Sequence, residues 1–135
     1  MTEKVGKTSH SVYNINYHIV FCPKYRNAIF TGELEYEISK LFKRIAYDYG
    51  FEVLEQMIMP DHIHLFISAP PRIAPTEIVK ILKSVSGNTM FKAFPNLKKS
   101  KFWSSGLWSK GYYVGTAGAV SSEIIVRYIQ DQKLK

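Results

Sequence analysis

The chain has 135 residues and a formal net charge of +7, with 46% hydrophobic and 21% charged residues. These values are typical of one globular domain, and they exclude a membrane protein because no apolar run approaches the roughly 18 residues of a membrane span. The N-terminus has no signal-peptide core, and the single cysteine, Cys22, excludes an intramolecular disulfide and a multi-cysteine metal site. We therefore expect one cytoplasmic domain over residues 1–135, with no membrane partner.

The hydrophobic pattern predicts strands and helices in a definite order along the chain. Residues 1–10 are polar and are expected to be loose, and Pro60-Asp61 is expected to join two antiparallel strands as a hairpin. A Lys-rich loop is expected after the second helix, and Gly115 and Gly118 are expected to form a flexible joint before the last one. The predicted elements are a strand in 13–26 that ends at Pro23, a helix over 33–50, strands at 51–59 and 62–68, a helix over 74–94, an interrupted strand in 102–116 and a helix over 120–132.

This order of elements predicts the fold class. Strand, helix, strand, strand, helix and strand in succession form the ferredoxin-like βαββαβ pattern, as in RNA-recognition-motif domains. We therefore expect an α+β fold with an antiparallel sheet and an appended C-terminal helix.

The segment PDHIHLFIS (60–68) carries two histidines at neighbouring positions on one face of a predicted strand. Ile63, Leu65 and Ile67 alternate with His62 and His64, so both imidazoles are expected to project from the face of the sheet that does not pack on the core. Such a pair can chelate one metal ion, but a bare HxH pattern also occurs by chance and needs partners from elsewhere in the chain.

The positive charge is concentrated in one part of the chain that has no acidic residue. Between Glu77 and Glu123 there are seven lysines and no aspartate or glutamate, and five of the residues from Phe102 to Tyr113 are aromatic. Lysines neutralise phosphates and aromatic rings stack on unpaired bases, so the window favours single-stranded nucleic acid. An anionic membrane surface is the rival partner, but no long basic amphipathic helix supports it.

The predicted last helix offers partners for the histidines. Tyr128 and Gln132 lie four residues apart and so share one helix face, flanking the apolar stripe. If that flank faces His62 and His64, the site holds two imidazoles, an amide oxygen and a phenol. Such a site suits phosphoryl transfer in which a divalent cation polarises the phosphate and the tyrosine attacks it.

Four motifs in one order give this chain a family resemblance. HIVFCPKYR (18–26), MPDHIHLFIS (59–68), YYVGT (112–116) and YIQDQ (128–132) together resemble the single-tyrosine HUH transposases of the insertion-sequence-two-hundred type. The resemblance extends from about Tyr13 to Gln132. It implies a DNA transposase that cleaves and rejoins single-stranded DNA, through a 5′-phosphotyrosine intermediate, at hairpins near the element ends.

The resemblance also implies roles for individual residues. His62, His64 and Gln132 would bind Mg²⁺ or Mn²⁺, Tyr128 would be the nucleophile, and residues 119–132 would form a mobile helix that can serve the partner subunit of a homodimer. Asp61 either orients a histidine or is only a turn residue. Imidazole ligands suit softer metals than magnesium, which leaves a tension with the ion that the family uses. The candidate DNA contacts are Lys24, Arg26, Lys80, Lys83, Lys98, Lys99, Lys101, Trp103 and Trp108.

Other functions remain open from the sequence. A non-catalytic binder of single-stranded nucleic acid would need only the basic, aromatic window. A metal-dependent hydrolase would use the histidines and leave Tyr128 a structural role. A nickase of the replication-initiator or relaxase type would share the HUH chemistry, but it would lack the YYVGT and YIQDQ context.

Overall fold

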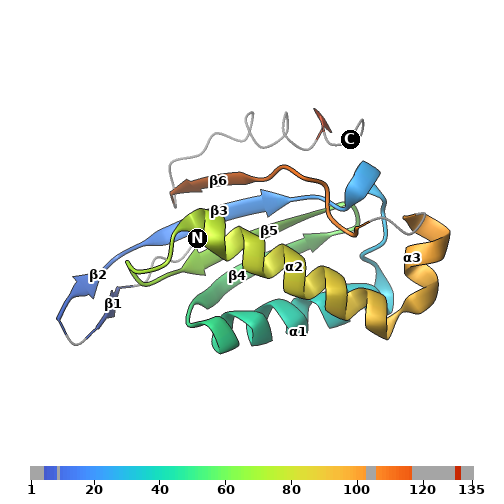
Figure 1. The fold of residues 1–135 in the computed structure, drawn as a ribbon. Coiled ribbons are helices and arrows are strands. Elements are labelled where there is room, and N and C mark those ends of the chain that lie inside the picture. The colour runs from blue at the N-terminus through green and yellow to red at the C-terminus, as the bar shows by residue number, and fades with distance from the viewer. Residues whose placement is uncertain (1–4, 9, 103–105, 117–129, 132–135) are drawn as a thin grey trace.

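The structure is a computed structural model, which describes residues 5–8, 10–102, 106–116 and 130–131. In the described part of the chain, a four-stranded antiparallel sheet carries two long helices on one face, and a small hairpin precedes it (Figure 1). The elements are β1 (Gly6–Lys7), β2 (Val12–Tyr13), β3 (Asn16–Phe21), the 3₁₀ helix η1 (Lys24–Arg26), α1 (Gly32–Tyr49), β4 (Glu52–Met59), β5 (His62–Ser68), α2 (Pro75–Ala93), α3 (Pro95–Lys101) and β6 (Tyr113–Thr116).

The sheet confirms the predicted ferredoxin-like class. Its strand order is β4-β5-β3-β6, and every neighbouring pair is antiparallel. β4 and β5 form the expected hairpin around Pro60-Asp61, while α1 connects β3 to β4 and α2 precedes β6. The appended helix expected over 120–132 lies outside the described residues except for Gln130 and Asp131, as do Tyr128 and Gln132.

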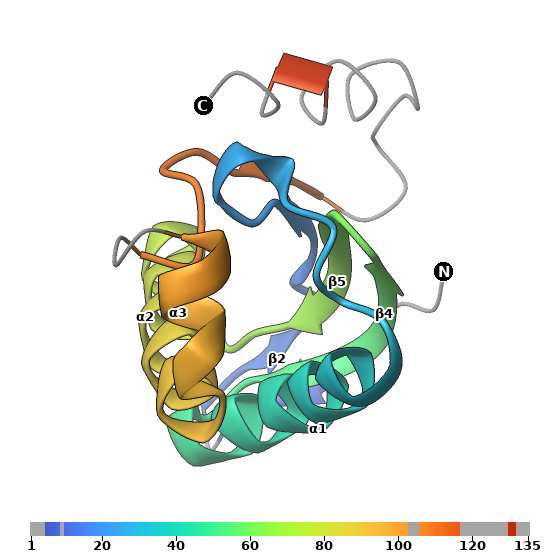
Figure 2. The same ribbon diagram turned by 90° about the vertical axis from the view of Figure 1, so that its right-hand side faces the viewer.

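The core lies between the sheet and the pair α1 and α2, which pack on the same side of it (Figure 2). The helical spacing seen in the sequence places Ile38, Phe42 and Ile45 of α1 in this core, and Gly50 ends the helix in the left-handed conformation at φ 84°. Ile78 and Leu82 of α2 are fully buried against the same sheet face. None of the helices in the described ranges is long and apolar enough to cross a membrane.

The structure confirms one of the predicted boundaries and corrects two elements. The first strand was expected to end at Pro23, and β3 ends at Phe21, shortly before that proline, while residues 24–26 turn as η1. The Lys-rich loop is the helix α3, which begins at Pro95 and buries Leu97. The strand expected over 102–116 is confined to β6, and an isolated bridge between Pro23 and Trp108 is the only β pairing before it in the described part of that segment.

The N-terminal segment expected to be loose also contains paired backbone. Gly6–Lys7 form β1, which pairs antiparallel with β2 in a two-stranded hairpin. The hairpin leads directly into β3, so it stands at one end of the sheet (Figure 1).

Candidate active site

The two histidines of β5 lie on the sheet face opposite α1 and α2, as the alternation predicts. Ile63, Leu65 and Ile67 are completely buried in the core, whereas His62 and His64 are partly exposed. The centroids of the two imidazole rings are 5.1 Å apart. One strand therefore presents two ring systems side by side on the face opposite α1 and α2.

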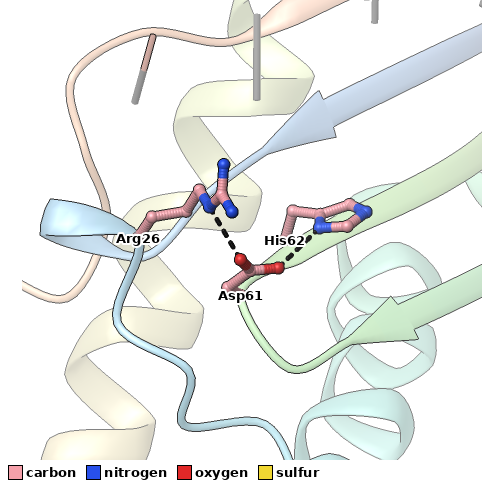
Figure 3. A network of polar contacts seen from close by, with 3 residues as sticks. All are labelled: Arg26, Asp61 and His62. Carbon is pink, nitrogen blue, oxygen red and sulfur yellow. Dashed lines mark hydrogen bonds and ion pairs between the residues drawn. The ribbon is translucent and has the colours of Figure 1, made fainter. Parts of the chain in front are cut away.

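His62 is held by a carboxylate on the hairpin turn. Nδ1 of His62 lies 2.8 Å from Oδ1 of Asp61, and Nε of Arg26 donates a hydrogen bond of 2.7 Å to Oδ2 of the same carboxylate (Figure 3). With Nδ1–H donating to the carboxylate, Nε2 is the ring nitrogen that carries a lone pair. Of the two roles that the sequence left open for Asp61, the structure shows the contact that orients a histidine.

His64 is held by a third histidine, which the sequence analysis did not identify. Nε2 of His18 lies 3.1 Å from Nδ1 of His64. His18 lies on β3, where it pairs with Phe66, and its ring stacks on the Phe66 ring at a centroid distance of 4.4 Å. The alternation of β3 could have placed His18 opposite Ile19 and Phe21, but only the register between β3 and β5 brings it to His64.

The surroundings of His64 and His18 favour neutral imidazoles at neutral pH. Burial, followed by repulsion from His62 and His18, lowers the pKa of His64 to about 4. Burial also lowers the pKa of His18. A neutral imidazole keeps the lone pair that a metal ligand needs, so the environment prepares His64 to bind a cation.

The carboxyl group of Asp61 is negatively charged in these surroundings. Its burial by itself would raise the pKa of its carboxyl, but the hydrogen bonds from His62 and Arg26 and the nearby positive charge of Arg26 outweigh that effect and lower the pKa. The carboxylate is therefore ionised at neutral pH and accepts from both neighbours.

The site, as far as the described residues go, offers two imidazole rings that could hold a metal ion. Within these residues there is no group of three or more His, Cys, Asp or Glu side chains arranged to hold a metal ion. Nδ1 of each β5 histidine is engaged by a neighbour, and in the tautomer in which Nδ1 carries the proton, Nε2 is the nitrogen that could hold a metal ion. His62 and His64 thus fit half of a metal site. The third predicted ligand, Gln132, lies outside the described residues.

Most of the predicted DNA-contact lysines belong to α2 and α3 and not to the strand that carries the two histidines. A groove of about 480 Å³ runs between α2 and residues 106–110 and is lined by Lys80, Lys83, Lys98 and Lys110 together with Phe91. Nζ of Lys98 lies 5.6 Å from the centre of the Phe91 ring. Cationic side chains beside an aromatic ring form a surface that suits a phosphate backbone with unpaired bases.

Two of the predicted DNA contacts are engaged in packing. The indole of Trp108 is 9% exposed, and its Nε1 donates to the Oγ of Ser86 at 2.9 Å. Nζ of Lys83 donates to the carbonyl oxygens of Ser109, Lys110 and Gly111 at 2.6, 3.2 and 3.1 Å. Neither side chain is freely exposed to solvent. Trp103 lies outside the described residues.

Replacing Lys83 with methionine is expected to lower the free energy of unfolding by about 1–3 kcal/mol, because the part-buried carbonyl of Ser109 and the exposed carbonyls of Lys110 and Gly111 lose their donor. Burial lowers the pKa of Lys83 to about 8, so the donor is still mostly protonated at neutral pH. Urea denaturation measures the loss, and Lys80→Met, an exposed lysine of the same helix, is the matched control with an expected change within about 0.5 kcal/mol. Equal stability of the two variants would contradict the structural role of Lys83.

Comparison with known proteins places this arrangement in a family. The family model described as "Transposase IS200 like" matches residues 11–132. The chain is 38% identical over 121 residues to the ISDra2 transposase TnpA of Deinococcus radiodurans, and the alignment covers 90% of this chain and 86% of that protein. It is 32% identical over 116 residues to the transposase for insertion sequence element IS200 of Salmonella typhimurium, covering 86% and 76% of the two chains.

Solved structures agree with the sequence comparison. The fold matches the crystal structure of a transposase-like protein from Deinococcus radiodurans R1 with a TM-score of 0.86 at 33% identity, over 94% of this chain and 97% of that one. A REP-associated tyrosine transposase, solved bound to a REP hairpin, shares the fold with a TM-score of 0.53 at 11% identity, over 92% and 67% of the chains. The chain therefore belongs to the IS200-like transposases, DNA-binding strand transferases encoded by insertion sequences.

Proposed function

We propose that the protein cleaves and rejoins single-stranded DNA at the ends of its element through a 5′-phosphotyrosine intermediate. The observation that carries this proposal is the pair His62 and His64, which lie side by side on the sheet face opposite α1 and α2 with Nδ1 of each engaged by a neighbour. A transposase that only held DNA would have no need of two oriented imidazoles. The pair instead suits a divalent cation beside the scissile phosphate.

The donor set fits a Mg²⁺ or Mn²⁺ ion held by His62, His64 and Gln132. Two imidazoles favour Mn²⁺ over Mg²⁺, because nitrogen ligands suit the softer ion. When bound, the cation would supply Lewis-acid polarisation of the phosphate that is attacked. Burial keeps the pKa of His64 low, so that its ring is neutral at neutral pH, and the carboxylate of Asp61 fixes the ring of His62.

Tyr128 is the nucleophile in this proposal. Its phenolic oxygen forms a bond to the phosphorus, the bond to the 3′ oxygen breaks, and that oxygen takes up a proton while the phenol loses one. The phosphotyrosine conserves the energy of the cleaved phosphodiester, so a 3′-hydroxyl from another strand can reverse the step without ATP. One tyrosine thereby performs both cleavage and joining.

The substrate in this proposal is a DNA hairpin with single-stranded flanks. The lysine-lined groove between α2 and residues 106–110 supports a phosphate-rich ligand. The shared fold with a transposase solved on a REP hairpin supports the hairpin form of that ligand. We expect Lys80, Lys98, Lys99 and Lys101, all exposed, to contact its backbone.

A homodimer completes the proposal. Gly115 was expected to belong to the joint, but it pairs with His18 inside β6, so the joint would lie after that strand, at Gly118, and would let the helix of one subunit reach the histidines of its partner. The reaction takes place in the cytoplasm, where the buried Cys22 stays reduced.

The test uses the full-length protein with Mn²⁺ and a labelled single-stranded oligonucleotide that carries an element end with its hairpin. We expect a covalent DNA–protein adduct on a denaturing gel, and we expect Tyr128→Phe to form none because phenylalanine has no hydroxyl to attack the phosphate. Tyr47→Phe, at an exposed position of α1, is the matched control and should retain the adduct.

Two other results would indicate a different function. Cleaved DNA without an adduct, unaffected by Tyr128→Phe, would indicate a metal-dependent hydrolase. Tight binding with neither cleavage nor adduct on a verified element end would indicate a non-catalytic binder. Either result would reject the phosphotyrosine mechanism.

A further inference from the structure

The residues 24–26 form a turn whose backbone is unusual for its side chains. Tyr25 and Arg26 both have positive φ angles, 59° and 52°, in the left-handed region that residues other than glycine seldom adopt. They are the only non-glycine residues with positive φ in the described ranges. Such strain persists where the surrounding structure fixes it, and it is concentrated at functional sites.

The turn aims Arg26 at the hairpin that carries the histidines. Arg26 follows β3, while Asp61 and His62 belong to the β4–β5 hairpin, and the three side chains form one connected line from guanidinium to carboxylate to imidazole (Figure 3). The side chains are 18%, 22% and 17% exposed respectively. An ion pair with this little exposure is more than a surface contact that solvent screens.

We propose that Arg26 is a positioning residue of the metal site, which acts through Asp61 to fix the ring of His62, and not a contact to the DNA backbone. This inference rests on the proposed function only in taking His62 as a metal ligand. Each oxygen of Asp61 has its own partner, Oδ1 with His62 and Oδ2 with Arg26, so the carboxylate is placed to orient the ligand and not to replace it.

The chemistry of the three groups explains the arrangement. A carboxylate that accepts from Nδ1–H selects the tautomer of His62 with its lone pair on Nε2, and it makes that nitrogen more electron-rich. Without Arg26 the carboxylate could rotate about its side chain and lose its alignment with the ring. The guanidinium holds one oxygen and leaves the other directed at His62.

A DNA-contact role for Arg26 conflicts with the position of Asp61. A phosphate that approached the guanidinium would meet the negative charge of Asp61 at the same place. Lys24 lies two residues earlier in the turn and is partly exposed. It remains the candidate for a phosphate contact from this segment.

The experiment measures metal binding without DNA and without catalysis. Mn²⁺ alone is titrated into the full-length protein, and the free ion is followed by electron paramagnetic resonance. We expect Arg26→Met to raise the Kd for Mn²⁺ by about 10- to 100-fold, the usual effect of losing an outer-shell partner. Arg44→Met, which removes an exposed guanidinium from α1, is the matched control and should leave the Kd unchanged.

Two further variants separate positioning from a general loss of structure. Arg26→Lys keeps the charge but not the planar donor, so it should weaken Mn²⁺ binding less than Arg26→Met while the melting temperature stays close to that of the wild type. Asp61→Asn should weaken Mn²⁺ binding by itself, and adding Arg26→Met to it should change the Kd by less than about twofold, because both residues act in one chain of contacts.

The DNA affinity of Arg26→Met tests the alternative role, a contact between Arg26 and the DNA backbone. In EDTA, Arg26→Met should bind a hairpin oligonucleotide within about twofold of the wild type, whereas a phosphate contact would lose affinity in proportion to the charge removed. An unchanged Mn²⁺ Kd in Arg26→Met would overturn the positioning role even if the wild type forms its tyrosine adduct. A wild type that binds no Mn²⁺ would overturn the proposed metal site as well.

Discussion

Replacing His64 with alanine is expected to lower the rate of adduct formation by at least about 10³-fold. In the proposed site the ring is one of two metal-binding imidazoles, and losing the cation would forfeit several kcal/mol of charge stabilisation, with each step of about 1.4 kcal/mol worth a factor of ten. The initial rate of adduct formation at saturating DNA and excess Mn²⁺ measures the loss.

The controls for His64→Ala follow from the structure. His10→Ala removes an exposed histidine from the N-terminal hairpin and should leave the rate unchanged. The Kd for Mn²⁺ should rise in His64→Ala and stay constant in His10→Ala. A His64→Ala enzyme that formed the adduct at the wild-type rate would show that the pair has no part in catalysis.

Replacing Trp108 with alanine is expected to cost about 3–5 kcal/mol of folding stability, the usual result of emptying a large aromatic site in a core. The ring centroid of Trp108 lies 4.7 Å from that of Phe21 and 5.4 Å from that of Phe30, and the indole N–H donates to Ser86. Removing it creates a cavity and leaves the hydroxyl of Ser86 without its donor. Urea denaturation of the DNA-free protein measures the change.

The same variant decides between packing and base stacking. A stacking role would cost about 1–3 kcal/mol of DNA affinity per base and leave the folding stability nearly intact. Tyr47→Ala, at a position 86% exposed on α1, is the control for the loss of an aromatic ring and should change stability by no more than about 0.5 kcal/mol. Wild-type stability in Trp108→Ala together with weak DNA binding would contradict the core role.

The acid-free, basic window between Glu77 and Glu123 shows a limit of predictions made from composition. Its lysines were predicted together as DNA contacts, but Lys83 donates to three carbonyls and Trp108 belongs to the core. The exposed cations Lys98, Lys99 and Lys101 lie on α3, a helix that was expected to be a loop. Charge counted along a sequence locates a basic surface, but it does not separate the side chains that face solvent from those that hold loops in place.

The sequence by itself determined the fold class and the face on which the histidines lie. Period-two alternation in β5 and helical spacing in α1 are local properties, since each depends only on which residues of one element are apolar. They were sufficient to place Ile63 in the core and His62 and His64 on the opposite face, and the order of elements was sufficient to predict the sheet.

Only the tertiary structure decided the partners of those histidines. His18 and His64 are 46 residues apart, and Arg26 and Asp61 are 35 apart, so each contact depends on the pairing register of β3 with β5 or on the path of the turn after β3. A shift of one residue in that register would turn His18 to the other face of the sheet. Alternation shows which way a side chain points, whereas its neighbour across the sheet is set by the packing of the whole chain.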